Sequence, residues 1–364
     1  MGNQSNDRPI EKPVLRYVHE DYGNKKADEI HERLTPFSET DAGKRPDFPF
    51  ADYIFPKTAT FEEYSELLKP WFEMKLENGV LECRCHTPGH EGFVWNLTSH
   101  MAIHQLFEYV NNDHDVELMI FGGSGKDFFE TIGPIDEYRD ASKPFVPMDD
   151  TDPRYNWQLL EHSYIDGTQD IESQVNLSIP LIGVWNGGGF HSDLYFFTDI
   201  TIATKDAWTT DTHFRLNMVP GDGIQIAWRS LMGIKRFNYA ELTGDVLTAK
   251  KALEYGMINE IEEDVESAYA RAHEIAELIM RSSTRQTRRL TVQVMRFPWR
   301  KQIADELRGS FSTEMWNTLS EASPHYPLYW EAAKAQARAT LEAEAKGKVL
   351  RPRIGPFIEE DPIV

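Results

Sequence analysis

A histidine and an aspartate in one short segment could perform acid–base chemistry. The segment "THFRLNMVPGDG", residues 212–223, contains His213 and, directly after a Pro-Gly pair, Asp222. Histidine titrates near neutral pH, and a carboxylate that accepts its N–H can fix the tautomer and stabilise the imidazolium. Each residue also has a structural explanation by itself. Asp222 could cap the helix expected in "GIQIAWRSLM", and a lone histidine is usually a structural residue.

The elements expected around this segment alternate between strands and helices, which is typical of a parallel, repeatedly crossed-over α/β core. The pattern of apolar residues and turn signals predicts them from residue 61 onward. They are a helix at 61–71, a hairpin at 72–86, a helix at 96–112, a strand at 116–125, a helix at 169–179, a strand at 180–189, a helix at 192–198 and a strand at 199–207.

The chain divides into three expected regions. Residues 1–60 are rich in charge and proline and predict a largely irregular extension. Residues 61–262 carry the α/β core, and residues 263–364 carry a helical module with a tail. Glu314 lies in "FSTEMW" on one of the helices of that module, where a glutamate is usually solvated or ion-paired.

Composition excludes several classes of function. The 364 residues include 59 acidic and 38 basic side chains, and the formal net charge of −21 repels nucleic acid and anionic membranes. No segment has the length and apolarity of a membrane span or a signal peptide. The two cysteines, Cys83 and Cys85, are expected on opposite faces of a strand and imply no disulfide framework. We therefore expect a soluble, cytoplasmic protein.

Three segments together resemble the enoyl-CoA hydratase/isomerase (crotonase) superfamily. They are 87–128, with "FGGSGKDF" at its end, 179–233, with "WNGGGF" and "VPGDG", and 241–261, with "ELTGD". The resemblance covers roughly residues 61–330. It implies a ββα spiral core followed by C-terminal helices that pack between subunits, hence a homotrimer or a dimer of trimers. It also implies an oxyanion site made by two backbone N–H groups.

The resemblance is closest to the β-diketone hydrolase branch, typified by 6-oxocamphor hydrolase. The two glutamates that handle water in the hydratases are absent, and Asp193 stands at the first of those positions. The spacing of His213 and Asp222 matches the hydrolase branch instead, as do His191 and Glu314. The resemblance then implies retro-Claisen cleavage of a C–C bond in a cyclic diketone.

The implied roles in this reaction are specific to each residue. His213 would be the base, Asp222 its orienting partner, His191 a donor to a substrate carbonyl, and Glu314 a group that positions water or assists proton transfer. The first oxyanion N–H would fall near Ile132. Substrate contacts are further expected from Trp95, Phe190 and Asp193, although for Trp95, as for the other large aromatic residues, a place in the core is the default interpretation.

Two other classes of function stay open from the sequence. One is an enzyme acting on CoA thioesters, as a hydratase, isomerase or hydrolase, and the other is a crotonase-like scaffold without catalysis. The sequence contains neither a complete metal-ligand constellation nor a dinucleotide fingerprint, so no metal and no organic cofactor is expected. His100 and His104, four residues apart on an expected helix, are interpreted as structural residues.

Overall fold

A computed structural model of the chain describes residues 59–87, 90, 92–95, 97–125, 127–132, 153–321 and 326–352. The expected extension at 1–60 therefore lies outside the described residues, except for its last two positions. The strands are β1 Phe72–Glu77, β2 Val80–Cys85, β3 Phe93–Trp95, β4 Leu118–Gly123, β5 Phe129–Ile132, β6 Leu181–Trp185, β7 Gly188–Gly189, β8 Ile200–Thr204, β9 Trp208–Thr209, β10 Leu247–Thr248 and β11 Glu260–Glu262.

The helices begin with α3 Phe61–Leu67 and end with a group of four near the C-terminus. They are α3, α4 Leu97–Asn112, α5 Pro153–Asn176, α6 Asp193–Phe196, α7 Ile224–Met232, α8 Ile234–Thr243, α9 Ala249–Tyr255, α10 Val265–Ser282, α11 Arg285–Met295, α12 Phe297–Glu321 and α13 Tyr326–Ala345, together with a 3₁₀ turn, η3, at Phe214–Leu216. The strand and helix order expected from the sequence is confirmed over these residues.

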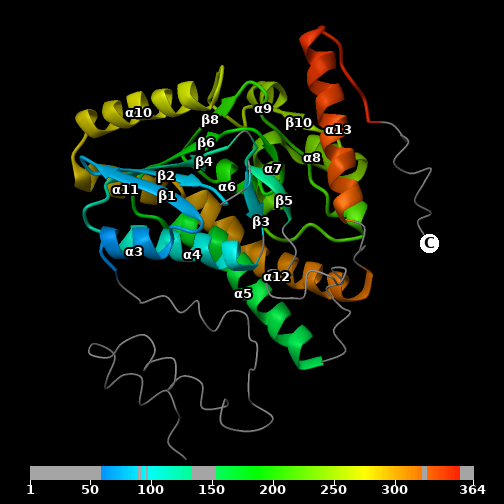
Figure 1. The fold of residues 1–364 in the computed structure, drawn as a ribbon, viewed down its shortest axis with the longest axis horizontal. Helices are drawn as coiled ribbons and strands as arrows, with labels where there is room; N and C mark the ends of the chain where they lie inside the picture. Colours follow the sequence, from blue (N-terminus) through cyan, green and yellow to red (C-terminus); the bar gives the residue numbers. More distant parts are fainter. Residues whose placement is uncertain are drawn as a thin grey trace, which may run out of the picture. The chain divides into compact units, whose positions relative to one another are not determined.

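The main sheet has six strands in the order β1-β2-β4-β6-β8-β11. The hairpin β1–β2 is antiparallel, and the pairings from β2 to β11 are parallel. Helix α10 covers one face of this sheet, while α4 and α5 lie on the opposite side (Figure 1). Every residue of β4 and β6 is buried, as expected for parallel strands with both faces covered.

Side-chain alternation along β4 explains how both faces acquire a core. Leu118 and Ile120 join a buried cluster with Tyr269 and other apolar residues of α10. Phe121 projects to the other side, where its ring lies 5.4 Å from that of Phe107 on α4. The strand is thereby fixed between two helical layers.

The turn of the first hairpin has the conformation that its sequence predicts. Asn78 and Gly79 both have positive φ, 51° and 81°, as a two-residue Asn-Gly hairpin turn requires. Cys83 and Cys85 are both buried and both free. The expectation that they project to opposite faces is wrong, because residues two apart on a strand share a face.

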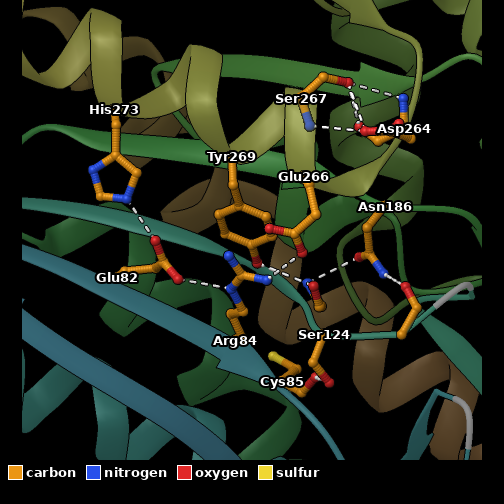
Figure 2. A network of polar contacts seen from close by, with 12 residues as sticks. Glu82, Arg84, Cys85, Ser124, Asn186, Asp264, Glu266, Ser267, Tyr269 and His273 are labelled. Atoms are coloured by element: carbon orange, nitrogen blue, oxygen red, sulfur yellow. Dashed lines mark hydrogen bonds and ion pairs between the residues drawn. The ribbon is translucent and has the colours of Figure 1, made fainter.

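A polar network fixes the turn that follows β4 (Figure 2). Asn186, directly after β6, accepts from Gly123 N at 2.9 Å and donates to Gly125 O at 2.8 Å. Tyr269 donates to Gly123 O at 3.1 Å, and the Arg84 guanidinium lies 3.8 Å from the centre of the Tyr269 ring. A Cβ atom at Gly123 would come within 2.5 Å of Asn186 Oδ1, so this close approach requires glycine.

The described residues from 59 onward form one compact unit. The C-terminal helices belong to it, since α10 packs on β4, β6 and β8, and α12 packs along α5 and α7. The boundary expected at residue 262 stays a prediction. Among the described residues, no helix is both long and apolar enough to cross a membrane.

Candidate active site

The segment that carries His213 is held by a small second sheet with the order β10-β9-β7. In it β9 pairs with β7 in parallel, Gly188 opposite Trp208. Gly188 must be glycine here, because a Cβ atom would come within 2.2 Å of Trp208 Nε1. This pairing brings the start of the His213 segment next to the glycine-rich turn that leads to His191.

The Pro-Gly turn brings a residue of α12 to the same place. A Cβ atom at Gly221 would lie 2.4 Å from Ser310 O and 2.9 Å from Glu314 Cβ. The Ser310 hydroxyl donates to Gly221 O at 2.9 Å and accepts from the Gln225 amide at 2.8 Å. Glycine at position 221 therefore permits α12 to pack closely enough for Glu314 of the same chain to reach Asp222 and His213.

His213 is bounded by three carboxyl groups. Its Nδ1 lies 2.6 Å from Asp211 Oδ1, which also accepts the His213 backbone N–H at 2.9 Å. Its Nε2 lies 3.6 Å from Glu314 Oε1 and 3.7 Å from Asp222 Oδ2. The structure therefore differs from the sequence-based expectation about the partner. Asp211 holds the Nδ1 side of the imidazole, whereas Asp222 faces Nε2.

Burial and charge set the protonation of this cluster. Burial opposes a positive charge on His213, but Asp211, Asp222 and Glu314 outweigh it and hold the His213 pKa well above 6.5. Burial raises the pKa of Glu314 to about 7, against the opposing effect of His213. Burial likewise raises the Asp222 pKa. Burial and the mutual charges of these groups thus raise the pKa values of all three side chains, a pattern that is common at acid–base sites.

His191 lies on the other side of Asp222. Its Nδ1 is 3.3 Å from Asp222 Oδ2 and 3.8 Å from Asp193 Oδ1. Burial first, and then the charges of His100 and His213, hold its pKa well below 6.5, so His191 is a neutral imidazole. Its φ of 53° is in the left-handed region, which is uncommon outside glycine and costs on the order of 1 kcal/mol at such sites.

The expected substrate-binding residues surround His191. The Trp95 ring stacks on the His191 ring with centroids 4.0 Å apart, and the Phe190 ring is 5.2 Å away. Asp193 is buried at the first turn of α6, and burial raises its pKa well above the usual value. The backbone of Ile132 pairs with that of Trp95. The structure thus places Trp95, Phe190 and Asp193 at one site, and the Ile132 backbone beside it.

Asp222 also contacts the start of a helix, as the alternative role of a helix cap predicts, but only through one long hydrogen bond. Helix α7 begins at Ile224 with Gly223 as its N-cap. Asp222 Oδ1 accepts the Ile224 N–H at 3.4 Å, a long hydrogen bond. One oxygen of Asp222 therefore faces the helix start, and the other faces the two histidines.

Sequence reasoning missed two parts of this site. Asp211 stands two residues before His213, a spacing that a side chain-to-backbone turn could have indicated. The second part is the position of His100 beside Trp95, and its interpretation as a structural residue stays a prediction. Its ring centroid is 4.0 Å from that of Trp95, and its Nδ1 is 3.7 Å from Asp170 Oδ2. No sequence spacing signals that α4 and α5 would bring this pair beside Trp95.

Three of these side chains could also hold a cation. One ligand atom each from His213, Asp222 and Glu314 lie within 4.8 Å of one another. Such a mixed nitrogen and oxygen donor set would suit zinc or another divalent transition metal. A metal bound there would occupy the nitrogen with which His213 could act as a base. The expectation that no metal is needed stays a prediction.

Replacing Glu314 by glutamine should stabilise the protein at alkaline pH relative to wild type. The Glu314 pKa of about 7 in the folded protein exceeds the ordinary 4.5, so its stabilising contribution is full at low pH and is lost as pH rises through 7. The shift corresponds to ~3 kcal/mol. Between about pH 5 and about pH 8, the melting temperature should fall less steeply with pH in Glu314→Gln than in the wild type. Asp305→Asn, an exposed change on the same helix, is the control; equal slopes in all three proteins would contradict this.

Comparison with known proteins gives a consistent group of matches. A family model described as enoyl-CoA hydratase/isomerase matches residues 76–310. A probable peroxisomal enoyl-CoA hydratase from Arabidopsis thaliana is 28% identical over 182 residues, which span 49% of this chain and 61% of that protein's length.

Solved structures match over longer stretches. A β-diketone hydrolase from the cyanobacterium Anabaena, bound to (S)-3-oxocyclohexyl acetic acid, is 25% identical with a TM-score of 0.62. That match covers 71% of this chain and 97% of the other. An enoyl-CoA hydratase/isomerase from Mycobacterium paratuberculosis is 19% identical with a TM-score of 0.59, and the match covers 69% and 95% of the two chains. These neighbours confirm the expected α/β fold class with its C-terminal helices.

Proposed function

The chain belongs to the enoyl-CoA hydratase/isomerase family, and we propose that within it this protein hydrolyses a C–C bond of a β-diketone. One observation carries the proposal. A single buried carboxyl group, Asp222, lies 3.7 Å from Nε2 of His213 and 3.3 Å from Nδ1 of His191. Two imidazoles beside one carboxyl group supply a base for water and a separate polar contact for a substrate carbonyl.

The first step is the attack of water on one carbonyl. Neutral His213 takes a proton from water through Nε2, and the new C–O bond places negative charge on the carbonyl oxygen. Asp211 accepts the Nδ1–H and stabilises the imidazolium that forms. Glu314, 3.6 Å from the same Nε2, is placed to orient the attacking water.

The second step breaks the C–C bond. The oxyanion collapses to a carboxylic acid, and the electrons of the broken C–C bond pass to the carbon between the two carbonyl groups, which forms an enolate with the second carbonyl. His191 and the backbone N–H near Ile132 are the proposed donors to this oxygen, with Trp95 stacked behind His191. The proton held by the imidazolium then goes to the enolate carbon, which returns His213 to its neutral form and releases a keto acid.

The Anabaena β-diketone hydrolase supports this proposal, since its bound ligand contains both a ring ketone and a carboxylate. The Arabidopsis relative instead supports the alternative of an enzyme acting on CoA thioesters. In that alternative two carboxylates would handle the water, whereas here a histidine occupies the centre of the carboxyl cluster. The central histidine therefore favours a β-diketone over a CoA thioester as the substrate.

The function is tested by supplying both substrate classes to the purified full chain. Bicyclic β-diketones and cyclohexane-1,3-dione are incubated after dialysis against chelator, beside crotonyl-CoA at equal concentration. We expect a keto acid that carries one labelled oxygen when the reaction is run in heavy-oxygen water. Hydration of crotonyl-CoA without diketone turnover would establish the alternative, and turnover of neither class would favour a scaffold.

The pH dependence of diketone cleavage should show an acidic limb above the ordinary histidine range. The three carboxyl groups hold the His213 pKa well above 6.5, and only neutral imidazole can act as the base. The kcat/KM value should therefore rise about tenfold per pH unit below that pKa and level off above it. A profile that is already flat from about pH 5 upward would contradict His213 as the base.

We also propose that the protein is a homotrimer or a dimer of trimers. Apolar side chains on α11 and the start of α12 are more than half exposed in the single chain, namely Leu290, Val294, Met295 and Phe297. Such a cluster is typical of a protein–protein contact. Light scattering at micromolar concentration should give a mass of three or six chains, and Val294→Asp should lower it. A monomer for the wild type would refute the assembly.

A further inference from the structure

Two glycine-rich turns lie side by side next to the candidate site. One follows β4 and leads into β5, and the other follows β6 and leads through β7 to His191. The two proposed donors to a substrate carbonyl come from these turns, since the N–H near Ile132 lies at the end of β5 and His191 lies two residues beyond β7. The distance between the donors therefore depends on how the two turns are held together.

Asn186 links the turns through its buried side chain (Figure 2). Its Oδ1 accepts from Gly123 N at 2.9 Å, and its Nδ2 donates to Gly125 O at 2.8 Å. The hydroxyl of Tyr195, on α6, donates to the same Oδ1 at 3.0 Å. Three of the four hydrogen bonds that an asparagine amide can make are thus present, and they fix the orientation of the amide.

Backbone hydrogen bonds complete this link between the turns. Phe128 N donates to Gly188 O at 3.0 Å, and Gly188 N donates to Asp127 Oδ1 at 3.1 Å. The Phe128 ring packs edge-on against the Tyr195 ring, with centroids 4.4 Å apart. Because Asn186, Phe128 and Tyr195 are all buried, the link is shielded from water that could compete for its hydrogen bonds.

We propose that Asn186 is a positioning residue, which ties the turn after β4 to the turn after β6 and so fixes the spacing between the N–H near Ile132 and His191. Its amide acts on the backbone that carries the donors and not on the substrate. Donors to a developing oxyanion must lie within hydrogen-bond distance of it, so a wider spacing weakens the stabilisation that they give. The inference rests on the proposed function for the identity of the carbonyl compound.

The first test compares Asn186→Ala with Asn111→Ala in the full chain. Asn111 Oδ1 accepts Ser178 N at 2.9 Å, so the control removes the same kind of acceptor near the other end of β6. Each protein binds (S)-3-oxocyclohexyl acetic acid labelled with heavy carbon at the ketone, and infrared spectroscopy records the carbonyl stretch. The stretch should lie below its value in water in the wild type and in Asn111→Ala, because fixed donors polarise the carbonyl. It should return toward the value in water in Asn186→Ala.

Diketone turnover gives a second readout. Asn186→Ala should lower kcat by about 10²-fold, the loss that follows a misplacement of about 1 Å. The KM value should change little, because the donors act mainly on the charge that develops in the transition state. Asn111→Ala should keep the wild-type kcat even where its melting temperature is lower.

Hydrogen exchange tests the link without a ligand. The Gly123 N–H, which Asn186 Oδ1 accepts, should exchange slowly in the wild type and lose this protection in Asn186→Ala. Equal protection in the two proteins would overturn the link. If Asn186→Ala does not fold, Tyr195→Phe takes its place, since it removes only the hydrogen bond to Asn186 Oδ1. It should shift the stretch in the same direction by a smaller amount, and an unchanged stretch would overturn the proposal.

The outcomes separate this proposal from the proposed function. Lost protection in Asn186→Ala together with a wild-type stretch and kcat would make Asn186 a residue of the fold alone. If the keto acid does not bind to the wild type, the diketone reaction loses its support, and the thioester carbonyl of crotonyl-CoA becomes the probe for the same comparison. Absence of diketone turnover with the expected stretch would remove only the proposed reaction.

Discussion

Replacing His213 by alanine should lower kcat/KM for the diketone by at least about 10²-fold, the usual scale for loss of a general base. The imidazole is the centre of the cluster, with Asp211 at 2.6 Å from one nitrogen and Glu314 and Asp222 facing the other. Its removal leaves three buried carboxyl groups around an empty position and takes away the proposed base. Steady-state kinetics on purified protein measure the loss.

Two controls separate lost chemistry from lost folding. His273→Ala removes a half-exposed imidazole on α10, where Figure 2 shows it paired with Glu82 of β2, and should retain wild-type rates. His213→Gln fills most of the space left by the ring and should be as inactive as the alanine variant. If either His213 variant turned over diketone at the wild-type rate while folded, the base would have to be another group, with Glu314 the next candidate.

Local sequence patterns predict most of the fold because its elements satisfy local rules. Asn78-Gly79 adopts the positive φ values that favour a hairpin turn, and the apolar run in β4 is buried on both faces as a parallel strand must be. The helix boundaries are less predictable. Helix α5 extends from Pro153, well before the segment at 169–179 in which the sequence predicts a helix, because the sequence before residue 169 has little apolar periodicity.

The sequence identifies most residues of the candidate site but not how they are arranged. The resemblance to the hydrolase branch identifies His213, Asp222, His191 and Glu314, and the structure brings all four together. It could not identify which oxygen meets which nitrogen, since that depends on a turn two residues long at Asp211. Asp170 carries no signal at all in the sequence, because only packing turns an ordinary helix carboxyl into a buried one.

The second large effect distinguishes Asp211 from Asp222, for which sequence and structure give different expectations. The sequence predicts that Asp222→Asn removes the orienting partner of His213, with a loss of about 10²-fold or more. The structure predicts that Asp211→Asn has this effect. Asp211 Oδ1 contacts both Nδ1 and the backbone N–H of His213, and its charge does most to raise the His213 pKa.

The two asparagine variants should differ most in their pH profiles. Removing the charge of Asp211 should move the acidic limb of kcat/KM furthest toward lower pH, because the carboxylate that chiefly raises the His213 pKa is gone. Asp222→Asn should move it less, since Asp222 Oδ2 is 3.7 Å from Nε2, beyond hydrogen-bond distance. The main effect of Asp222→Asn should be a less fixed orientation of His191, whose Nδ1 lies 3.3 Å from Asp222 Oδ2. The substrate carbonyl should then be bound more weakly.

Both variants should remain folded, because asparagine preserves the shape of each side chain. Their melting temperatures relative to wild type are measured first, and then kcat/KM across the pH range. If Asp222→Asn produced the larger shift of the acidic limb and Asp211→Asn the smaller, the orienting role would return to Asp222, as the sequence predicts. The 2.6 Å contact between Asp211 and His213 Nδ1 would then serve only to shape the loop. The tautomer of His213 would instead be fixed by Asp222 at Nε2.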